Sequence, residues 1–437
     1  MNRILWICNI MLPAIGQEIN LPYSNREGWL SGIFEKVQKK EAPFTLGVCF
    51  PLGGAQIRQL KEKKFSVQGI VCYAFEENLD TPEIYDAGLE NVFQKVIADF
   101  SPDIVHIFGT EFPHALAAVR AFDKPERTLI GIQGLCSEIA KVYMAGLPER
   151  ASQKVTFRDW LKRDSIRQQQ EKFIRRGENE KKAMLGCGNI TGRTAFDKEG
   201  SAKINPYARY YFMNETMRRE FYTGKWSPET CEKHSILLGQ GDYPLKGMHF
   251  VLEAAALLVE KYPDLKLYVT GNSILGHGTL KEKIKLSAYG KYLLTLIKRY
   301  DLEDKVVMTG KRSAQEMKQQ FLNSSVFVCA SVLENSPNTV GEAQLLGVPV
   351  VASKAGGIPD MVKDGVSGLL FSVGNVKELA DKIEAVWDDN VCEDGLCLSE
   401  RLCQGERKQA GFVHDGERNY LRLLEIYEAI GEAEAKV

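Results

Sequence analysis

The chain has 437 residues, and its 44% hydrophobic and 26% charged residues are typical of a globular protein of two or three domains, which excludes a disordered or fibrous one. A net charge of −1 leaves no basic excess for phosphate backbones, so we expect no nucleic-acid partner. Ten cysteines without a CxxC pair are typical of reduced, buried thiols. Cys392, Cys397 and Cys403 are the only cluster, and no histidine lies beside them at metal-ligand spacing, so we expect a cytoplasmic protein with no bound metal and no cofactor.

The first half of the chain alternates apolar runs with helical patterns. Five of the runs predict buried strands: Ile4–Cys8, Leu46–Phe50, Gly69–Tyr73, Ile104–Phe108 and Thr128–Ile132. Helices are predicted at Pro82–Phe100 and Pro113–Phe122, and a long charged helix over residues 157–182. This alternation is typical of a doubly wound α/β domain.

The second half repeats this rhythm with shorter connections. Its predicted strands are Ser235–Leu238, Leu265–Thr270, Lys305–Met308, Val326–Ala330 and Val348–Ala352, and its helices Met248–Lys261, Leu280–Arg299 and Ala314–Leu322. The pattern breaks within REFYTGKWSP, where aromatic residues, Gly and Pro cluster. We therefore expect two domains, residues 1–222 and 223–415, followed by an amphipathic helix over Gly416–Ile430.

The stretch LENSPNTVGEA places two glutamates, Glu334 and Glu342, around a helix start. Ser336 is predicted as the N-cap and Pro337 as the first helical residue. The first N–H groups of this helix then face the carboxyl end of a parallel sheet, where phosphorylated ligands bind. Glu342, in the second turn, is placed to accept hydrogen bonds from a ribose diol, and Glu334 to face the other end of a diphosphate. The alternative is a helix N-terminus that merely attracts acids.

Three further features lie in predicted loops. Lys246, in GDYPLKG, follows a strand and is placed to neutralise a diphosphate as a point charge; the alternative is a solvated lysine at a helix start. Gly356 and Gly357, in SKAGGIPDMV, permit close approach of a ligand or form a plain tight turn. Gly16, in the predicted loop PAIGQE, is a candidate to cover the diphosphate from the first domain.

As an ordered set, these motifs resemble the donor domain of family 4 retaining glycosyltransferases. The resemblance rests on ILLGQGDYPLKG, LYVTGNS, VVMTGKR and SVLENSPNTVGEAQLLGVPVVASKAGGIPDMVKDGVSGLLF, and PDIVHIFGTEFPHAL is similar to the acceptor-side domain of that family. It implies a GT-B architecture of two Rossmann-like, doubly wound α/β domains facing across a cleft. Residues 1–222 would bind the acceptor and residues 223–415 the nucleotide sugar, with the helix of residues 416–437 packing back on the first domain.

The resemblance also implies roles for individual residues in a metal-independent transfer that retains the anomeric configuration. Glu334 would contact the hydroxyls of the transferred sugar and Lys246 the leaving diphosphate, and these are the catalytic candidates. Glu342 would bind the ribose. The remaining donor-binding candidates are Gly16, Gln240, Asn335, Ser336, Pro337, Asn338 and Thr339, with Gly310 and Lys311 lining the base pocket.

Two positions depart from the family pattern. Gln240 stands where the family commonly has an arginine, which removes one cation from the departing diphosphate. Gln133 stands where many members have a histidine near the donor sugar, and a glutamine can hydrogen-bond the sugar but cannot act as a base. Arg193 is a candidate for the missing cation, with Arg209 and Arg218 as alternatives; each is also compatible with a solvated arginine.

Two features concern the acceptor. Trp29 opens a predicted helix and is a candidate to stack on a sugar, or it packs beneath a loop. The charged helix over residues 157–182 begins with Phe157, Trp160 and Leu161 on one face. It predicts either a solvated helix or a contact with the membrane surface for a lipid-linked acceptor.

These observations predict a retaining glycosyltransferase that moves a hexose from a UDP-, GDP- or ADP-sugar to a saccharide or lipid-linked acceptor, in the synthesis of a cell-surface polysaccharide or glycolipid. We expect it in the cytoplasm, either free or peripheral at the inner face of the membrane. Two alternatives remain open at this point. One is a non-catalytic nucleotide-sugar-binding relative, suggested by Gln240 and Gln133, and the other is a nucleotide-sugar epimerase of the same fold.

Overall fold

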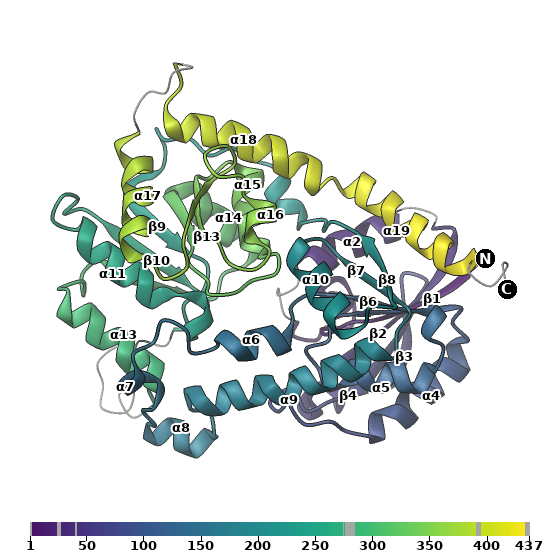
Figure 1. Cartoon of the computed structure of the whole chain (residues 1–437). Coiled ribbons are helices and arrows are strands. Elements are labelled where there is room, and N and C mark those ends of the chain that lie inside the picture. Colours follow the sequence, from purple (N-terminus) through teal and green to yellow (C-terminus); the bar gives the residue numbers. More distant parts are fainter. Residues whose placement is uncertain are drawn as a thin grey trace. The chain divides into compact units, whose positions relative to one another are not determined.

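The chain divides into two compact units of parallel α/β structure, seen in a computed structural model that describes residues 2–23, 28–39, 42–273, 275, 285–389 and 395–432 (Figure 1). The first unit comprises Met1–Lys141, Lys172–Met217 and His414–Val437, and the second comprises Val142–Glu171 and Arg218–Val413. The division after Met217 lies five residues before the predicted boundary. Val142–Glu171, which the prediction placed in the first domain, belongs to the second unit.

The first unit is built on an eight-stranded sheet of order β3-β4-β2-β1-β5-β6-β7-β8. All neighbours are parallel except β3, which runs antiparallel to β4. The strands are β1 (Asn2–Ile7), β2 (Phe44–Leu52), β3 (Lys64–Val67), β4 (Ile70–Glu76), β5 (Ile104–Phe108), β6 (Thr128–Gly131), β7 (Asn189–Gly192) and β8 (Arg209–Phe212). All five predicted strands are present, whereas β3, β7 and β8, of four residues each, were missed. The edge strands β3 and β8 mix polar with apolar residues and form no continuous apolar run.

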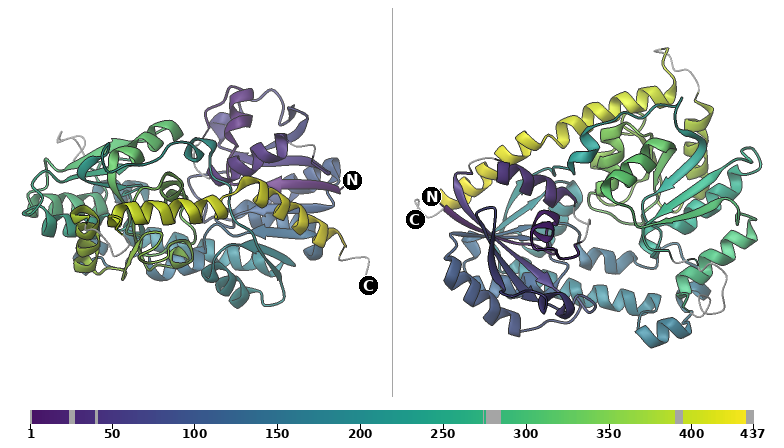
Figure 2. Two further views of the ribbon diagram at one scale, coloured as in Figure 1. Left: turned by 90° about the horizontal axis from the view of Figure 1, so that it is seen from above. Right: turned by 180° about the vertical axis from the view of Figure 1, so that it is seen from behind.

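Helices cover both faces of this sheet, as the views from above and behind show (Figure 2). They are α1 (Pro13–Glu18), α2 (Gly28–Lys39), α3 (Gly54–Ile57), α4 (Gly88–Phe100), α5 (Pro113–Phe122), α6 (Cys136–Val142), α9 (Ile166–Leu185), α10 (Ala195–Ile204) and α19 (Gly416–Gly431). Phe93 of α4 and Leu116 of α5 share one core cluster, and Phe34 of α2 and Ile426 of α19 share the other. The last helix therefore completes the core of the first unit.

A buried polar contact joins the ends of the chain within this core. The Tyr427 hydroxyl of α19 accepts a hydrogen bond from Trp6 Nε1 at 2.7 Å and lies 2.8 Å from His106 Nδ1 on β5. Burial lowers the pKa of His106 to about 3, so this imidazole is neutral. His106 is thus a core residue.

The second unit has a six-stranded parallel sheet of order β11-β10-β9-β12-β13-β14. The strands are β9 (Glu232–Leu238), β10 (Lys266–Thr270), β11 (Val306–Gly310), β12 (Ser324–Cys329), β13 (Val350–Ser353) and β14 (Leu369–Phe371). The chain moves outward from β9 to β11, then returns to β12 on the other side of β9. This reversal defines a Rossmann-like topology with its switch point between β9 and β12.

The helices of the second unit connect these strands. They are α7 (Glu149–Ser152), α8 (Phe157–Lys162), α11 (Met248–Leu258), α13 (Ala288–Arg299), α14 (Ala314–Asn323), α15 (Asn338–Leu346), α16 (Ile358–Met361), α17 (Val376–Asp388) and α18 (Leu398–Val413). Residues 280–284 of the predicted helix Leu280–Arg299 lie outside the described residues.

The prediction of one long helix over residues 157–182 is wrong. Helix α8 ends at Lys162, because Arg163 adopts a left-handed conformation with φ 49°. Ser165 then starts α9, since its N–H donates to Gln168 Oε1 and its hydroxyl accepts from the Gln168 N–H. Two short-range caps therefore divide the charged stretch in two.

Candidate functional site

Two loops at the switch point of the second unit carry the predicted charged groups. Strands β9 and β12 are parallel neighbours, with β10 beyond one and β13 beyond the other. Lys246 lies in the loop after β9, and Glu334 in the loop after β12. Ligands of open α/β sheets bind outside the carboxyl ends of the strands at this point. The fold thus brings together two residues that are 88 positions apart.

Lys246 and Glu334 form an ion pair, with Lys246 Nζ 2.5 Å from Glu334 Oε1. The Ser331 hydroxyl donates to the same carboxylate oxygen at 2.8 Å. Burial works against the charge on Lys246, but the carboxylate of Glu334 outweighs it, and the pKa of Lys246 is raised above its ordinary value. The lysine is therefore a cation over the whole physiological pH range, and 21% of its side chain is exposed at the sheet edge.

Backbone contacts fix the two loops to each other. The Val332 N–H donates to Leu245 O at 2.8 Å, which ties the Glu334 loop to the Lys246 loop. The Ser353 hydroxyl at the end of β13 donates to Ser331 O at 2.6 Å. The ion pair is thus held by neighbouring strands.

The paired glycines after β13, Gly356 and Gly357, lie against the backbone of Glu334. Gly357 N–H donates to Glu334 O at 2.9 Å. Gly356 has φ +54°, and a methyl group added there would lie 2.0 Å from Glu334 O. These contacts place the Glu334 backbone, and close approach of a ligand to the glycines stays a prediction.

Helix α15 begins one residue later than predicted. Pro337 is its N-cap, with extended backbone angles of φ −66° and ψ 118°, so Asn338 is the first helical residue and Ser336 lies outside the helix. A methyl group on Gly239 would lie 3.2 Å from Thr339 Cγ2, which places the helix N-terminus beside the end of β9. The N-terminal N–H groups of α15 therefore lie at the same switch point as Lys246.

Glu342, in the second turn of α15, is buried and bound to an arginine. Arg218 Nε and Nη2 both donate to Glu342 Oε1, at 2.9 and 2.5 Å. Burial raises the pKa of Glu342, and Arg218 opposes this shift. Among the three arginines considered for the missing cation, Arg218 thus contacts a predicted donor-binding residue. Arg209 instead lies over the Tyr211 ring in the first unit.

The other predicted donor-binding positions of the second unit also lie on its carboxyl-edge loops. Gln240 follows β9, and its Cγ lies 3.5 Å from the position of a methyl group added at Gly271. Gly310 ends β11 with φ +76° and open space around its Cα, and Lys311 is exposed beside it. Asn335 is buried in the loop that follows β12.

Gly16 does not lie in a loop. It is an interior residue of α1, and a methyl group there would lie 2.9 Å from Tyr23 Cβ and 3.0 Å from Met11 Cε. The apolar pattern around Leu12 and Ile15 forms a short helix that packs this glycine against protein. Trp29 lies in α2, and its side chain lies outside the described part of the structure.

Gln133 and Arg193 are brought together in the first unit. Arg193 Nη1 donates to Ile132 O at 3.0 Å, and its Nη2 lies 3.5 Å from Gln133 Oε1. The same guanidinium pairs with Glu215 at 2.6 Å, and both side chains are at least 90% buried, with 9% and 3% exposed. The alternative of a solvated arginine is therefore wrong for Arg193.

Sequence analysis missed a polar network at the switch point of the first unit, between β1 and β5. His114 Nδ1 lies 2.8 Å from Glu77 Oε2 and His114 Nε2 lies 3.1 Å from Asn9 Oδ1, while Asn9 Nδ2 donates to Glu111 Oε2 at 3.1 Å. A methyl group on Gly109 would lie 2.2 Å from Glu111 Oε2, so a glycine leaves room for this carboxylate. Glu111 and His114 stand in PDIVHIFGTEFPHAL, but Asn9 and Glu77 follow other strands, and no spacing links them.

The two units, each with charged groups at the switch point of a parallel sheet, define a protein of the GT-B fold. In agreement, the chain is similar over 99% of its length to sucrose-phosphate synthase from Thermosynechococcus elongatus, with a TM-score of 0.70, 13% identity and 100% of that chain covered. It is also similar over 98% of its length to Anabaena HepE in complex with UDP and glucose, with a TM-score of 0.65, 16% identity and 100% of that chain covered.

Residues 227–403, which lie in the second unit, match the family model described as glycosyl transferases group 1. D-inositol 3-phosphate glycosyltransferase from Arthrobacter sp. (strain FB24) is 35% identical over 146 residues, which are 33% of this chain and 32% of that protein. The putative colanic acid biosynthesis glycosyltransferase WcaL from Escherichia coli (strain K12) is 31% identical over 146 residues, 32% of each chain. The matched stretch thus spans about a third of these relatives.

Within the residues that the structure describes, no helix combines the length and the apolar character needed to cross a bilayer. Across the same residues, no three His, Cys, Asp or Glu side chains are grouped so that they could hold a metal ion.

Proposed function

We propose that the chain is a retaining glycosyltransferase that moves a hexose from a nucleotide-diphosphate sugar to a saccharide or lipid-linked acceptor. The observation that carries this proposal is the Lys246–Glu334 ion pair at the switch point, beside the N-terminus of α15. A fixed cation next to the N–H groups of a helix start is suited to a diphosphate, and a carboxylate next to them is suited to sugar hydroxyls.

The proposed chemistry uses these groups at the leaving phosphate. The bond between the anomeric carbon and the diphosphate oxygen breaks, the acceptor oxygen bonds to the same face of that carbon, and the acceptor proton passes to the leaving phosphate. Lys246 and the N–H groups of Asn338 and Thr339 stabilise the negative charge that develops on the diphosphate. Because the lysine supplies this charge, no metal is part of the proposal.

Glu334 and Glu342 would hold the two ends of the donor. On binding, the diphosphate replaces Glu334 as the partner of Lys246, which releases the carboxylate to accept hydrogen bonds from sugar hydroxyls. Arg218 contacts Oε1 of Glu342, so the ribose would be held through Oε2. Gly310 and Lys311 would flank the base, and UDP, GDP and ADP each remain candidates.

Similar proteins support the substrate classes. HepE was crystallised with UDP and glucose, and the WcaL name refers to colanic acid, a polysaccharide. We propose by extension that this chain acts in cell-surface polysaccharide or glycolipid synthesis. Its acceptor would bind to the first unit, near Gln133 and Arg193.

The test is release of nucleoside diphosphate from a panel of UDP-, GDP- and ADP-hexoses, first without an acceptor and then with mixed saccharide and lipid-linked acceptors. Glu334→Gln is measured beside Glu303→Gln, a matched change at an exposed glutamate before β11. We expect turnover of one donor, lost in Glu334→Gln and kept in Glu303→Gln. The anomeric proton coupling of the product then reports retention.

Two outcomes would replace the proposal. Binding of a nucleotide sugar without turnover under every condition would indicate a non-catalytic relative, with Gln240 and Gln133 as the cause to examine. Conversion of the donor to another nucleotide sugar without an acceptor would indicate an epimerase.

A further inference from the structure

Helix α8 presents large apolar side chains outward and a charged side chain inward. Phe157, Trp160 and Leu161 are 61%, 67% and 65% exposed, whereas Asp159 of the same helix is fully buried. Tryptophan, phenylalanine and leucine are normally interior residues and aspartate is normally exposed, so this helix reverses the usual arrangement. The exposed side chains form a group that we call the α8 patch: Val155, Phe157, Trp160 and Leu161.

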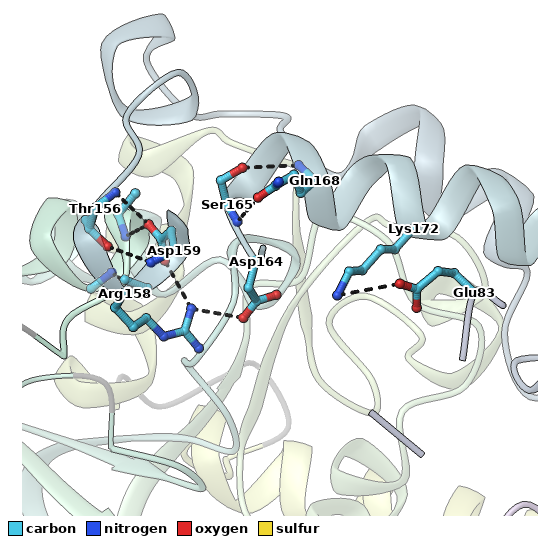
Figure 3. A network of polar contacts seen from close by, with 11 residues as sticks. Glu83, Thr156, Arg158, Asp159, Asp164, Ser165, Gln168 and Lys172 are labelled. Atoms are coloured by element: carbon cyan, nitrogen blue, oxygen red, sulfur yellow. Dashed lines mark hydrogen bonds and ion pairs between the residues drawn. The ribbon is translucent and has the colours of Figure 1, made fainter. Parts of the chain in front are cut away.

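The inward side of α8 is fixed by its aspartate (Figure 3). Asp159 Oδ2 accepts hydrogen bonds from the Ala288 N–H at 2.8 Å and from the Thr156 N–H at 3.2 Å, and Thr156 Oγ1 in turn caps the helix by accepting from the Asp159 N–H. Ala288 is the first residue of α13, so the carboxylate also meets the positive end of that helix. The second unit therefore holds α8 in one orientation, with its apolar face turned outward.

Exposed basic residues flank the α8 patch in the sequence. Lys154, Lys162 and Arg163 are exposed around it. Asp159 and Asp164, the two aspartates of this stretch, pair with Arg158. The Arg158 Nη1 atom lies 3.0 Å from Asp159 Oδ1 and 2.9 Å from Asp164 Oδ2 (Figure 3). What the helix offers outward is thus an aromatic and aliphatic surface with a basic rim.

This combination of groups selects one kind of partner. Trp and Phe side chains favour the boundary between headgroups and acyl chains, and lysine and arginine at that depth attract anionic headgroups. We infer that the α8 patch is a docking surface for an anionic lipid bilayer, which Phe157, Trp160 and Leu161 enter while Lys154, Lys162 and Arg163 contact the headgroups. The surface lies within the second unit and does not depend on the proposed transferase chemistry.

The test is co-sedimentation of the full chain with vesicles of phosphatidylcholine alone and of phosphatidylcholine with phosphatidylglycerol. We expect binding to the anionic vesicles only. The triple variant Phe157→Ser, Trp160→Ser, Leu161→Ser should bind at least about tenfold more weakly. The charge variant Lys154→Gln, Lys162→Gln should lose about fivefold for each lysine. The double variant Leu257→Ser, Val366→Ser, which removes apolar side chains of similar exposure elsewhere in the second unit, should bind unchanged.

Tryptophan fluorescence gives a second measurement on the folded protein. Trp160 is exposed, whereas Trp6 and Trp226 are buried, so entry of Trp160 into a bilayer should shift the emission to the blue with anionic vesicles and not with Trp160→Phe. Equal binding of the triple variant and the unchanged chain would overturn the inference. Concentration-dependent self-association that the triple variant abolishes, without vesicle binding, would assign the patch to a second copy of the chain and would also overturn it.

Discussion

The two parallel sheets of this chain carry different polar groups at their switch points. In the second unit, a lysine and a glutamate on adjacent loops pair beside a helix start, and backbone hydrogen bonds hold both loops. In the first unit, the buried His114 contacts Glu77 and Asn9, and Asn9 in turn donates to Glu111. An arginine of the same unit, Arg193, pairs with Glu215. The second unit thus presents a cation to its edge, whereas the first presents hydrogen-bonding groups.

This difference fits two kinds of ligand. A cation at a helix start suits an anionic ligand of fixed shape such as a diphosphate. Carboxylate and amide oxygens suit hydroxyl groups, whose number and spacing vary among acceptors. The comparison therefore predicts that changes in the second unit weaken donor use, and that changes in the first unit act on its stability and on the acceptor.

The largest expected effect concerns the buried ion pair of the first unit. Arg193→Met leaves Glu215 charged and buried without its ion-pair partner, which should cost about 3–5 kcal/mol of unfolding free energy. The double variant Arg193→Met, Glu215→Met should recover most of this loss. Chemical denaturation followed by Trp fluorescence checks both. A loss below about 1 kcal/mol in the single variant would show that water reaches this pair.

Lys246→Ala should reduce donor turnover by about 10²–10³-fold, because the cation acts on charge that develops in the transition state. The matched change Lys305→Ala, at the opposite end of the same sheet, should leave turnover within about twofold because that lysine lies away from the carboxyl edge. Steady-state release of nucleoside diphosphate measures both. Equal losses in the two variants would contradict a specific role for the carboxyl edge.

Gly356→Ala tests whether the glycine loop sets the position of Glu334. The added methyl group would meet Glu334 O in a left-handed conformation, so we expect a loss of roughly 3 kcal/mol together with lower turnover. Gly310→Ala is the matched control, since Gly310 also has a positive φ but open space, and it should cost only about 1 kcal/mol. Thermal unfolding compares the two. Equal shifts in Tm would mean that backbone strain alone matters.

The smallest expected effect is the pH dependence that one residue of the first unit, His106, contributes to stability. Burial lowers the pKa of His106 to about 3, so the unfolded chain binds a proton more readily than the folded one between that value and about 6.5. Stability is therefore present above about 6.5 and is lost as the pH falls, by about 1.4 kcal/mol at pH 5.5 from this residue. His106→Gln should reduce the slope of Tm against pH between 7.5 and 5.5. An unchanged slope in this variant would contradict the prediction.

The sequence predicted those parts of the fold and of the candidate site that depend on one continuous stretch of residues. Apolar runs predicted the central strands of both sheets, and LENSPNTVGEA with Lys246 predicted two loops that the structure joins at 2.5 Å. The short edge strands β8 and β14 were missed. By contrast, the four-residue interior strands β6 and β13 were predicted, because they lie in continuous apolar runs. The Arg218–Glu342 pair was also missed, since its partners are 124 positions apart and only the fold brings them together.

Assignment of Val142–Glu171 to the second unit shows the same limit. Nothing in its composition indicates which unit it joins. One contact that holds it there is made by the carboxylate of Asp159, which accepts from the N-terminus of a helix 129 positions later. Conversely, the apolar face of α8 was visible in the sequence, but its exposure depends on that contact. Local patterns thus predicted elements, and tertiary contacts decided their surroundings.

The return of α19 to the first unit has a consequence for synthesis of the chain. Trp6 of β1 and Tyr427 of α19 meet 421 positions apart, so the first core lacks one of its covering helices until the stretch between them has been synthesised. The nascent first unit must therefore keep apolar surface such as that of Leu30 and Phe34 exposed while the second unit is made and folds. A cell that makes this protein has to shield an unfinished domain for most of its translation.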